Sequence, residues 1–180
     1  MQNESYFFKN QLLIAMPSLD DDTFSHSLVY VDNHTSEGAI GIIINKPIEL
    51  TVERLLHHLD IESTENDNLN YPVYMGGPVS QDQGFVLDLS VNEKDLQIVA
   101  SREILSRIGK GTGPNQYIIA LGYCEWDAGQ LEQEVLDNCW LVAPYSPELI
   151  LNSPPAERWK LAAKSIGVNI HRVSGISGHA

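Results

Sequence analysis

The chain has 180 residues, of which 43% are hydrophobic and 19% charged, and this composition predicts one soluble globular domain over residues 1–180. Its 24 acidic and 11 basic residues give a formal charge of −13, which disfavours a broad DNA-binding face because nucleic acids are held mainly through their phosphates. Only two cysteines occur, Cys124 and Cys139, which excludes a disulfide framework.

The sequence shows no signal for export or membrane insertion. The apolar run at 12–16 is too short for the core of a signal peptide and is stopped by Pro17. No apolar stretch has the roughly 20 residues that a membrane-spanning helix needs. We therefore expect a cytoplasmic protein without a membrane partner.

The first predicted elements are strands. The short apolar runs at 12–16 and 27–32 are typical of buried strands. A polar turn at 34–38 separates the second run from a continuous apolar run at 39–44. This spacing predicts a β-hairpin whose second strand is buried on both faces.

A helix and a loop are predicted next. Thr51 is a favourable N-cap, and apolar residues recur after it at helical spacing over 52–59. The following stretch, 60–70, is polar and acidic, which predicts a loop. A short strand at 73–75 ends at a pair of glycines.

The second half mixes strands and helices. The predicted elements are a strand at 84–89, a strand at 96–100, a helix at 101–109 capped by Ser101, a strand at 117–121, a helix at 127–137, a strand at 140–142, a short helix from Pro147 and a final helix from Ser153 to Ile166. Strands occur in hairpin-like pairs as well as between helices, so we predict the α+β class.

Two glycine-rich turns are candidate anion sites. Gly76-Gly77-Pro78 lies at a strand end, where paired glycines allow either a nest of backbone N–H groups or simply a tight turn. The run at 109–114 follows a predicted helix and precedes a strand, which is the reverse of the order in a phosphate loop. That second run is therefore interpreted as a helix end and a turn.

Thiol and metal chemistry have weak support in the sequence. A helix beginning near Asp127 would lower the pKa of the Cys124 thiol, whereas the acidic side chains of Glu125 and Asp127 would raise it. His57 and His58 are adjacent on a helix and point about 100° apart, so they cannot chelate one metal ion. No catalytic set, metal site or cofactor is predicted.

Several segments occur together, in the same order, in one bacterial family. They are 12–17, Asp22 with Phe24, 38–47, 74–79, 84–87, 111–114, 120–123, Trp126, 128–132, Asn138, 158–159 and 178–180. With these segments the chain resembles the YqgE/AlgH family. The resemblance implies an α+β fold with a bent, partly barrel-like mixed β-sheet, helices packed around it, and a bacterial cytoplasmic location.

The resemblance does not imply a catalytic residue set. Family members are often labelled transcriptional regulators, in part because of a role suggested in alginate synthesis. The chain departs from the usual pattern at Gln83, Asp88 and the pair Cys124-Glu125, where the family often has arginine, histidine and two small residues. An anion site formed by that arginine and histidine is not expected here.

Our leading hypothesis is a non-enzymatic regulatory or protein-binding module, with a role in transcription by family resemblance. The residues expected to border its groove are Asn45, Lys46, Pro47, Gly76, Gly77, Pro78 and Trp126. An alternative is a small-molecule or anion-binding protein, or an enzyme, that uses the Gly76-Gly77-Pro78 turn. A third hypothesis is a redox switch at Cys124.

The expected partner is a protein. Direct nucleic-acid binding stays open only through a locally basic segment near the C-terminus, because the rest of the chain is acidic. Its basic residues are Arg158, Lys160, Lys164 and Arg172.

Overall fold

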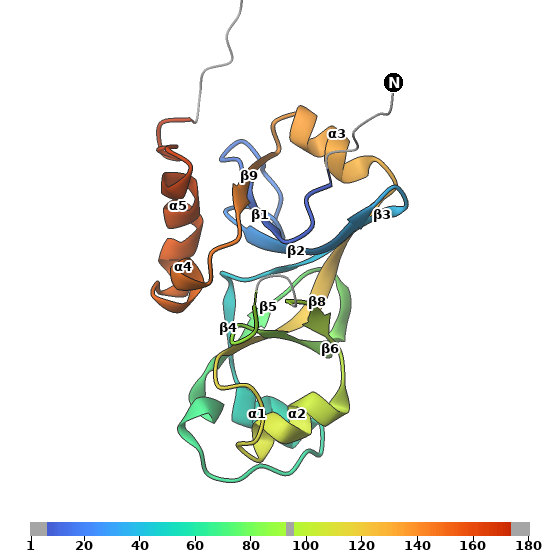
Figure 1. Cartoon of the computed structure of the whole chain (residues 1–180), viewed down its shortest axis with the longest axis vertical. Helices are drawn as coiled ribbons and strands as arrows, with labels where there is room; N and C mark the ends of the chain where they lie inside the picture. The colour runs from blue at the N-terminus through green and yellow to red at the C-terminus, as the bar shows by residue number, and fades with distance from the viewer. Residues whose placement is uncertain (1–6, 93–95, 174–180) are drawn as a thin grey trace, which may run out of the picture. The chain divides into compact units, whose positions relative to one another are not determined.

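The computed structural model describes residues 7–92 and 96–173, which form two compact units (Figure 1). Unit 1 is made of residues 1–41 and 125–180, and unit 2 of residues 42–124. This division into compact units does not test whether residues 1–180 form a single domain, so that expectation stays a prediction. Residues 178–180, which contribute to the family resemblance, lie outside the described residues.

Unit 1 is built on strands in the order β3-β2-β1-β9. Their bounds are β1 Gln11–Ala15, β2 Leu28–Thr35, β3 Gly38–Ile43 and β9 Trp140–Pro144. β1 pairs antiparallel with both neighbours, so that Leu13 lies opposite Val29 on one side and Val142 on the other. The strands predicted at 12–16, 27–32 and 140–142 are confirmed by these elements.

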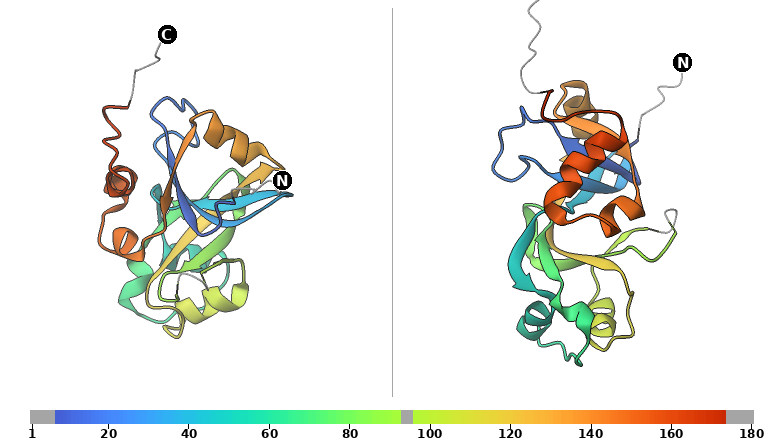
Figure 2. Two further views of the ribbon diagram at one scale, coloured as in Figure 1. Left: turned by 45° about the horizontal axis from the view of Figure 1, so that its top comes forward. Right: turned by 90° about the vertical axis from the view of Figure 1, so that its left-hand side faces the viewer.

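Three helices belong to unit 1, and their bounds are α3 Gln130–Leu136, α4 Pro147–Leu151 and α5 Pro155–Ser165. α5 packs against β1, β2 and β9, and α4 lies beside it (Figure 2). The indole N–H of Trp159 donates to the Ala15 carbonyl at 2.9 Å, which attaches α5 to the end of β1. α3 begins at Gln130 rather than at Asp127, because the strand β8 (Tyr117–Asp127) continues to Asp127 and Gly129 takes a left-handed φ of 76°.

A single carboxylate attaches α3 to β9 and to the last residues of β8, which belong to unit 1. Oε2 of Glu134 accepts the indole N–H groups of Trp126 and Trp140, each at 2.9 Å. Its Oε1 accepts from Nε2 of Gln130, also at 2.9 Å. Both indoles are buried, and the ring of Phe24 packs against both of them. Two buried donors are therefore satisfied by one acceptor.

Unit 2 holds a mixed sheet. Its strands are β4 Pro47–Thr51, β5 Pro72–Met75, β6 Val79–Asp88, β7 Ile98–Val99 and β8 Tyr117–Asp127. β5 is parallel to β8, while the pairs β4–β5, β6–β8 and β6–β7 are antiparallel. β4 was not expected from the sequence, and β6 begins at Val79, five residues before the predicted start at Gly84.

The helices of unit 2 begin at the caps that the sequence predicts. Thr51 caps α1 (Val52–His58) by accepting the Arg54 N–H at 3.3 Å. Ser101 caps α2 (Arg102–Gly109) by accepting the Glu103 N–H at 3.2 Å. A short 3-10 helix, η1 (Asp67–Asn70), occupies part of the predicted loop. α1 and α2 lie against each other at one end of the unit (Figure 1).

The core of unit 2 lies between these helices and the sheet. Its buried residues are Val52, Leu55, Leu56, Ile61, Leu69, Val73, Val86, Leu105, Ile108, Tyr117 and Ile119. Burial of these side chains is the main source of stability for a unit of this kind.

The predicted α+β class is confirmed. The sheet is mixed, helices pack on it, and the strand order within each unit, over the residues described, is open rather than closed into a barrel. Within the same residues no helix is both long and apolar enough to cross a bilayer.

We predict that Glu134→Ala lowers the free energy of unfolding by about 2 kcal/mol, because two buried indole N–H groups lose their acceptor. Gln133→Ala is the matched control on the same helix, since Gln133 is exposed and its side-chain amide donates to the exposed Asp137 just after α3. That control is expected to change the stability by less than about 0.5 kcal/mol. Urea denaturation followed by circular dichroism measures both variants, and equal effects would contradict the role of Glu134.

Candidate functional site

The Gly76-Gly77 turn brings two backbones into direct contact. The Gly76 N–H donates to the Leu121 carbonyl at 2.8 Å, and the Gly76 carbonyl accepts from the Ile43 N–H at 2.8 Å. A Cβ on Gly76 would lie 2.3 Å from the Gly122 carbonyl oxygen, so only glycine fits. The turn thus serves close packing, and the engaged Gly76 N–H argues against an anion nest at this residue.

The pairing of β6 with β8 is interrupted at Gly122. This glycine adopts φ of 76°, and a Cβ there would lie 2.3 Å from the Gly77 carbonyl oxygen. On β6, Val79 is opposite Tyr123, but the next paired residue, Gly84, is opposite Leu121. Residues 80–83 therefore face Gly122 alone and form a bulge, which we call the β6 bulge. Bulges of this kind redirect side chains and are common beside binding sites.

The β6 bulge is exposed and locally strained. Ser80, Gln81, Asp82 and Gln83 are all exposed, although the strand becomes buried from Gly84 onward. Ser80 has φ of 50°, a left-handed conformation that a serine seldom adopts. Strain of this type persists where the surrounding structure enforces it, and such positions cluster at functional sites.

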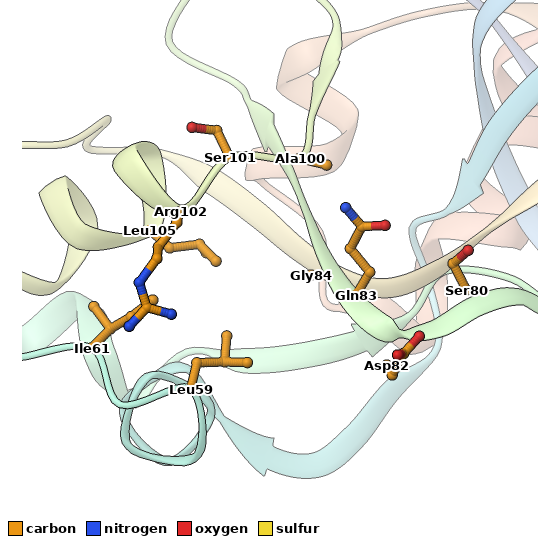
Figure 3. Close-up of a pocket in the computed structure, with 10 residues that line it drawn as sticks. All are labelled: Leu59, Ile61, Ser80, Asp82, Gln83, Gly84, Ala100, Ser101, Arg102 and Leu105. Carbon is orange, nitrogen blue, oxygen red and sulfur yellow. The ribbon is translucent and has the colours of Figure 1, made fainter.

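A cavity of about 500 Å³ opens beside the β6 bulge (Figure 3). We call it the bulge cavity, and its lining residues are Leu59, Ile61, Ser80, Asp82, Gln83, Gly84, Ala100, Ser101, Arg102 and Leu105. Ile61 and Leu105 are buried members of the core of unit 2, so the floor of the cavity is the surface of that core. The volume lies within the range of roughly 300–1,000 Å³ typical of ligand sites.

The rim of the bulge cavity carries one charge of each sign. Asp82 belongs to the β6 bulge, and Arg102 is the first residue of α2. Nη2 of Arg102 donates to the Asp60 carbonyl at 2.9 Å, which limits the positions that the guanidinium group can take. The lining is therefore mixed, with polar and charged groups around the apolar side chains of the floor, and such polar groups can fix the orientation of a ligand.

The family is shown by comparison with known proteins. The AlgH-like family model matches residues 12–171. The chain belongs to the AlgH-like family. A UPF0301 protein from Thioalkalivibrio sulfidiphilus is 44% identical over 96% of this chain and 97% of its own length. One from Coxiella burnetii is 43% identical over 95% and 96%. The resemblance noted in the sequence is therefore confirmed.

Solved structures agree with this AlgH-like assignment. The solution structure of AlgH from Pseudomonas aeruginosa has a TM-score of 0.76 at 36% identity, and the match covers 100% of both chains. Protein DIP2367 from Corynebacterium diphtheriae has a TM-score of 0.69 at 18% identity, over 93% of this chain and 92% of that one. The second similarity concerns the fold alone.

The residues predicted to border a groove are divided between the units. Asn45, Lys46 and Pro47 lie next to the Gly76-Gly77-Pro78 turn of unit 2, because the Met75 N–H donates to the Lys46 carbonyl at 2.9 Å. Trp126 belongs to unit 1, where it is buried and donates its N–H to Glu134. A groove bordered by all seven stays a prediction, and none of them lines the bulge cavity.

The bulge cavity was not found from the sequence. Three separate segments, 59–61, 80–84 and 100–105, line it. Two signals in the sequence point to single members: the cap at Ser101, and Gln83, where the chain departs from its family. Neither signal indicates that these segments meet.

Cys124 is fully buried, and its Sγ–H donates to the Gly76 carbonyl at 3.3 Å. Burial raises the pKa of this thiol far above its ordinary range, and the Ile43 N–H and the charge of Lys46 offset this only in part. The thiolate is the reactive form of cysteine, so this environment argues against a redox switch at Cys124.

The basic C-terminal segment is only partly accessible. Arg158 is buried at 7% exposure and is not placed to neutralise phosphates. Nζ of Lys160 lies 3.7 Å from a carboxylate oxygen of Glu157. Lys164 and Arg172 are exposed. Nucleic-acid binding through this segment stays a prediction, and the buried Arg158 is not among the residues that could contribute to it.

We predict opposite effects for two glycine substitutions in unit 2. Gly76→Ala is expected to destabilise the protein by about 3 kcal/mol, because the new methyl group meets backbone atoms that cannot move aside. Gly84→Ala is the matched control, since a Cβ there finds its nearest neighbours at 3.8–4.0 Å. It should be neutral or stabilising by up to about 1 kcal/mol. Thermal unfolding measures both, and similar melting temperatures would refute the close approach at Gly76.

We predict that Cys124 does not react with a thiol reagent in the folded protein at neutral pH. The experiment uses Cys139→Ser, so that Cys124 is the remaining thiol, and it should label fully in concentrated guanidinium chloride. Because the folded state raises the pKa of Cys124, stability is retained at neutral pH and falls as the pH rises past the ordinary thiol range. Rapid labelling of the folded variant would contradict this environment.

Proposed function

We propose that this AlgH-like protein is a non-enzymatic, regulatory protein-binding module, and that the bulge cavity is where it recognises an extended segment of a partner protein. The observation that carries the proposal is the β6 bulge itself. Its residues 80–83 are exposed and lie outside the ladder with β8, beside an apolar floor. Extended peptides are commonly bound through main-chain groups of a strand together with a pocket for one side chain.

The thiol of Cys124 and the imidazole of His34 are side chains of the kind that often take part in catalysis, but both have structural roles here, which supports a binding function. The Cys124 thiol keeps its proton and bonds within the fold. Nδ1 of His34 accepts the Phe8 N–H at 2.9 Å, and its Nε2 lies 3.2 Å from a carboxylate oxygen of Glu132. This histidine is buried between Phe7 and Phe8, where it holds the chain before β1.

Regulation through a protein partner, rather than through DNA, fits the charge of the chain. A net charge of −13 repels nucleic acid at long range, whereas it does not hinder a protein segment that presents some positive charge. The family resemblance directs this proposal toward the control of transcription. A cytoplasmic location belongs to the same proposal and agrees with two cysteines that are both free thiols.

The test is selection of random-sequence peptides, displayed on phage, against the immobilised full chain. Ala100→Trp is the blocking variant, since Ala100 is exposed and lines the cavity, so an indole there covers apolar floor without disturbing the core. Ala156→Trp is the matched control, an exposed alanine on α5 in the other unit.

The selected peptides should bind the native chain and Ala156→Trp alike, with an affinity at least about tenfold weaker for Ala100→Trp. Fluorescence anisotropy of labelled peptides measures this difference. Selection of no peptide, or equal binding to both tryptophan variants, would overturn the proposal.

A further inference from the structure

Asp82 and Arg102 face the same cavity without neutralising each other. Figure 3 shows them on opposite sides of the lining, with Leu59 between them in this view. Within residues 7–92 and 96–173, neither takes part in an ion pair shorter than 4.0 Å. Two opposite charges held apart across an apolar floor offer separate contacts to a ligand long enough to reach both.

Arg102 is suited to hold a carboxylate. One N–H of its guanidinium group is used by the Asp60 carbonyl, and this tether restricts the side chain before any ligand arrives. The other N–H groups are available in the flat arrangement that matches the two oxygens of a carboxylate. The Ser101 hydroxyl, which accepts the Glu103 N–H, still has its own proton to donate beside this group.

Asp82 is suited to hold a cation. Its side chain is exposed on the β6 bulge, and an ionised carboxylate only accepts hydrogen bonds. The bulge is anchored at its two ends, by Val79 opposite Tyr123 and by Gly84 opposite Leu121, and Asp82 lies between these ends at the cavity rim. A lysine or arginine side chain is the ordinary partner for such a group in a protein segment.

The rest of the cavity lining is mixed. Leu59, Ile61 and Leu105 give it apolar surface, and the last two are 7% and 5% exposed, while the side chains of Ser80, Gln83 and Ser101 add polar atoms. Because the apolar residues belong to the core, the floor is rigid enough to accept a side chain by shape. An apolar residue of the bound segment therefore fits between its two charged groups.

We infer that the bulge cavity selects a charge pattern in its partner: an apolar residue flanked by an acidic residue at Arg102 and a basic residue at Asp82. This inference rests on the proposed function and adds the chemistry of the segment and its direction across the cavity. The two rim charges are different, so a segment lying in the reverse direction would place like charges together.

The acidic residue is the diagnostic part of the pattern. A chain with a net charge of −13 attracts basic peptides at any exposed acidic patch, and it repels acidic ones. An acidic residue that recurs among cavity-binding peptides therefore requires a local cationic contact. Arg102 is the arginine that lines this cavity.

The experiment repeats the peptide selection with the double variant Asp82→Lys/Arg102→Glu. This variant exchanges the two charges and leaves the formal net charge at −13. The matched control is Glu103→Lys/Arg107→Glu, which exchanges two exposed charges on α2 that do not line the cavity. All three proteins are first compared by circular dichroism. The changed residues are exposed, and the double variant and its control each lose one arginine hydrogen bond to a carbonyl, from Arg102 to Asp60 and from Arg107 to Thr112, so the two are matched in this respect.

The native chain and the control should enrich peptides with the basic, apolar and acidic residues in one order along the sequence, and the double variant should enrich the opposite order. Arg102→Glu alone should weaken binding of a native-selected peptide by about tenfold or more, with recovery when the acidic residue of the peptide is changed to lysine. Peptides that lack the acidic residue, or that keep one order on the double variant, would overturn the inference.

The two proposals fail in different ways. If peptides are blocked by Ala100→Trp yet show no charge pattern, the cavity binds protein segments and the inference about charge is wrong. If Ala100→Trp blocks nothing, the proposed function itself is wrong, and with it the inference.

Discussion

The structure of unit 2 depends on the direct contact of two backbones, at Gly76-Gly77 on one side and at the strand β8 on the other. The Gly76 N–H and carbonyl both bond to neighbouring strands, and a Cβ on Gly77 would lie 2.2 Å from Tyr123 backbone atoms. No side chain fits at this distance, so glycine is a steric requirement of the fold here. The same contact buries the Cys124 thiol, whose proton is donated to Gly76.

This contact also shapes the surface where we place recognition. Gly122 adopts its left-handed conformation against Gly77, and the pairing of β6 with β8 shifts at that residue. The shift leaves residues 80–83 outside the ladder, and Ser80, Asp82 and Gln83 become part of the cavity lining. The floor beneath is the core of unit 2, so substitutions at Ile61 or Leu105 would change stability as well as binding. Substitutions at the exposed rim residues are expected to change binding without changing stability.

Unit 1 shows how residues that look functional in a sequence can be structural. Trp126 is buried, and together with Trp140 it donates to one carboxylate of Glu134. Burying an indole without an acceptor for its N–H is costly, which is a sufficient reason for this arrangement. The AlgH-like family model matches residues 12–171, and the solved AlgH structure has the same fold. The activity has to be argued from the site, since one fold can support many functions.

The sequence by itself determined the α+β class, the family, and the helix starts at Thr51 and Ser101, because caps and apolar spacing are local properties of the chain. It did not indicate β4 or the β6 bulge, since the pairing of a strand is set by its neighbour rather than by its own pattern. The bulge cavity was decided by tertiary structure alone. Its walls come from 59–61, 80–84 and 100–105, and only folding brings these distant segments together around one opening.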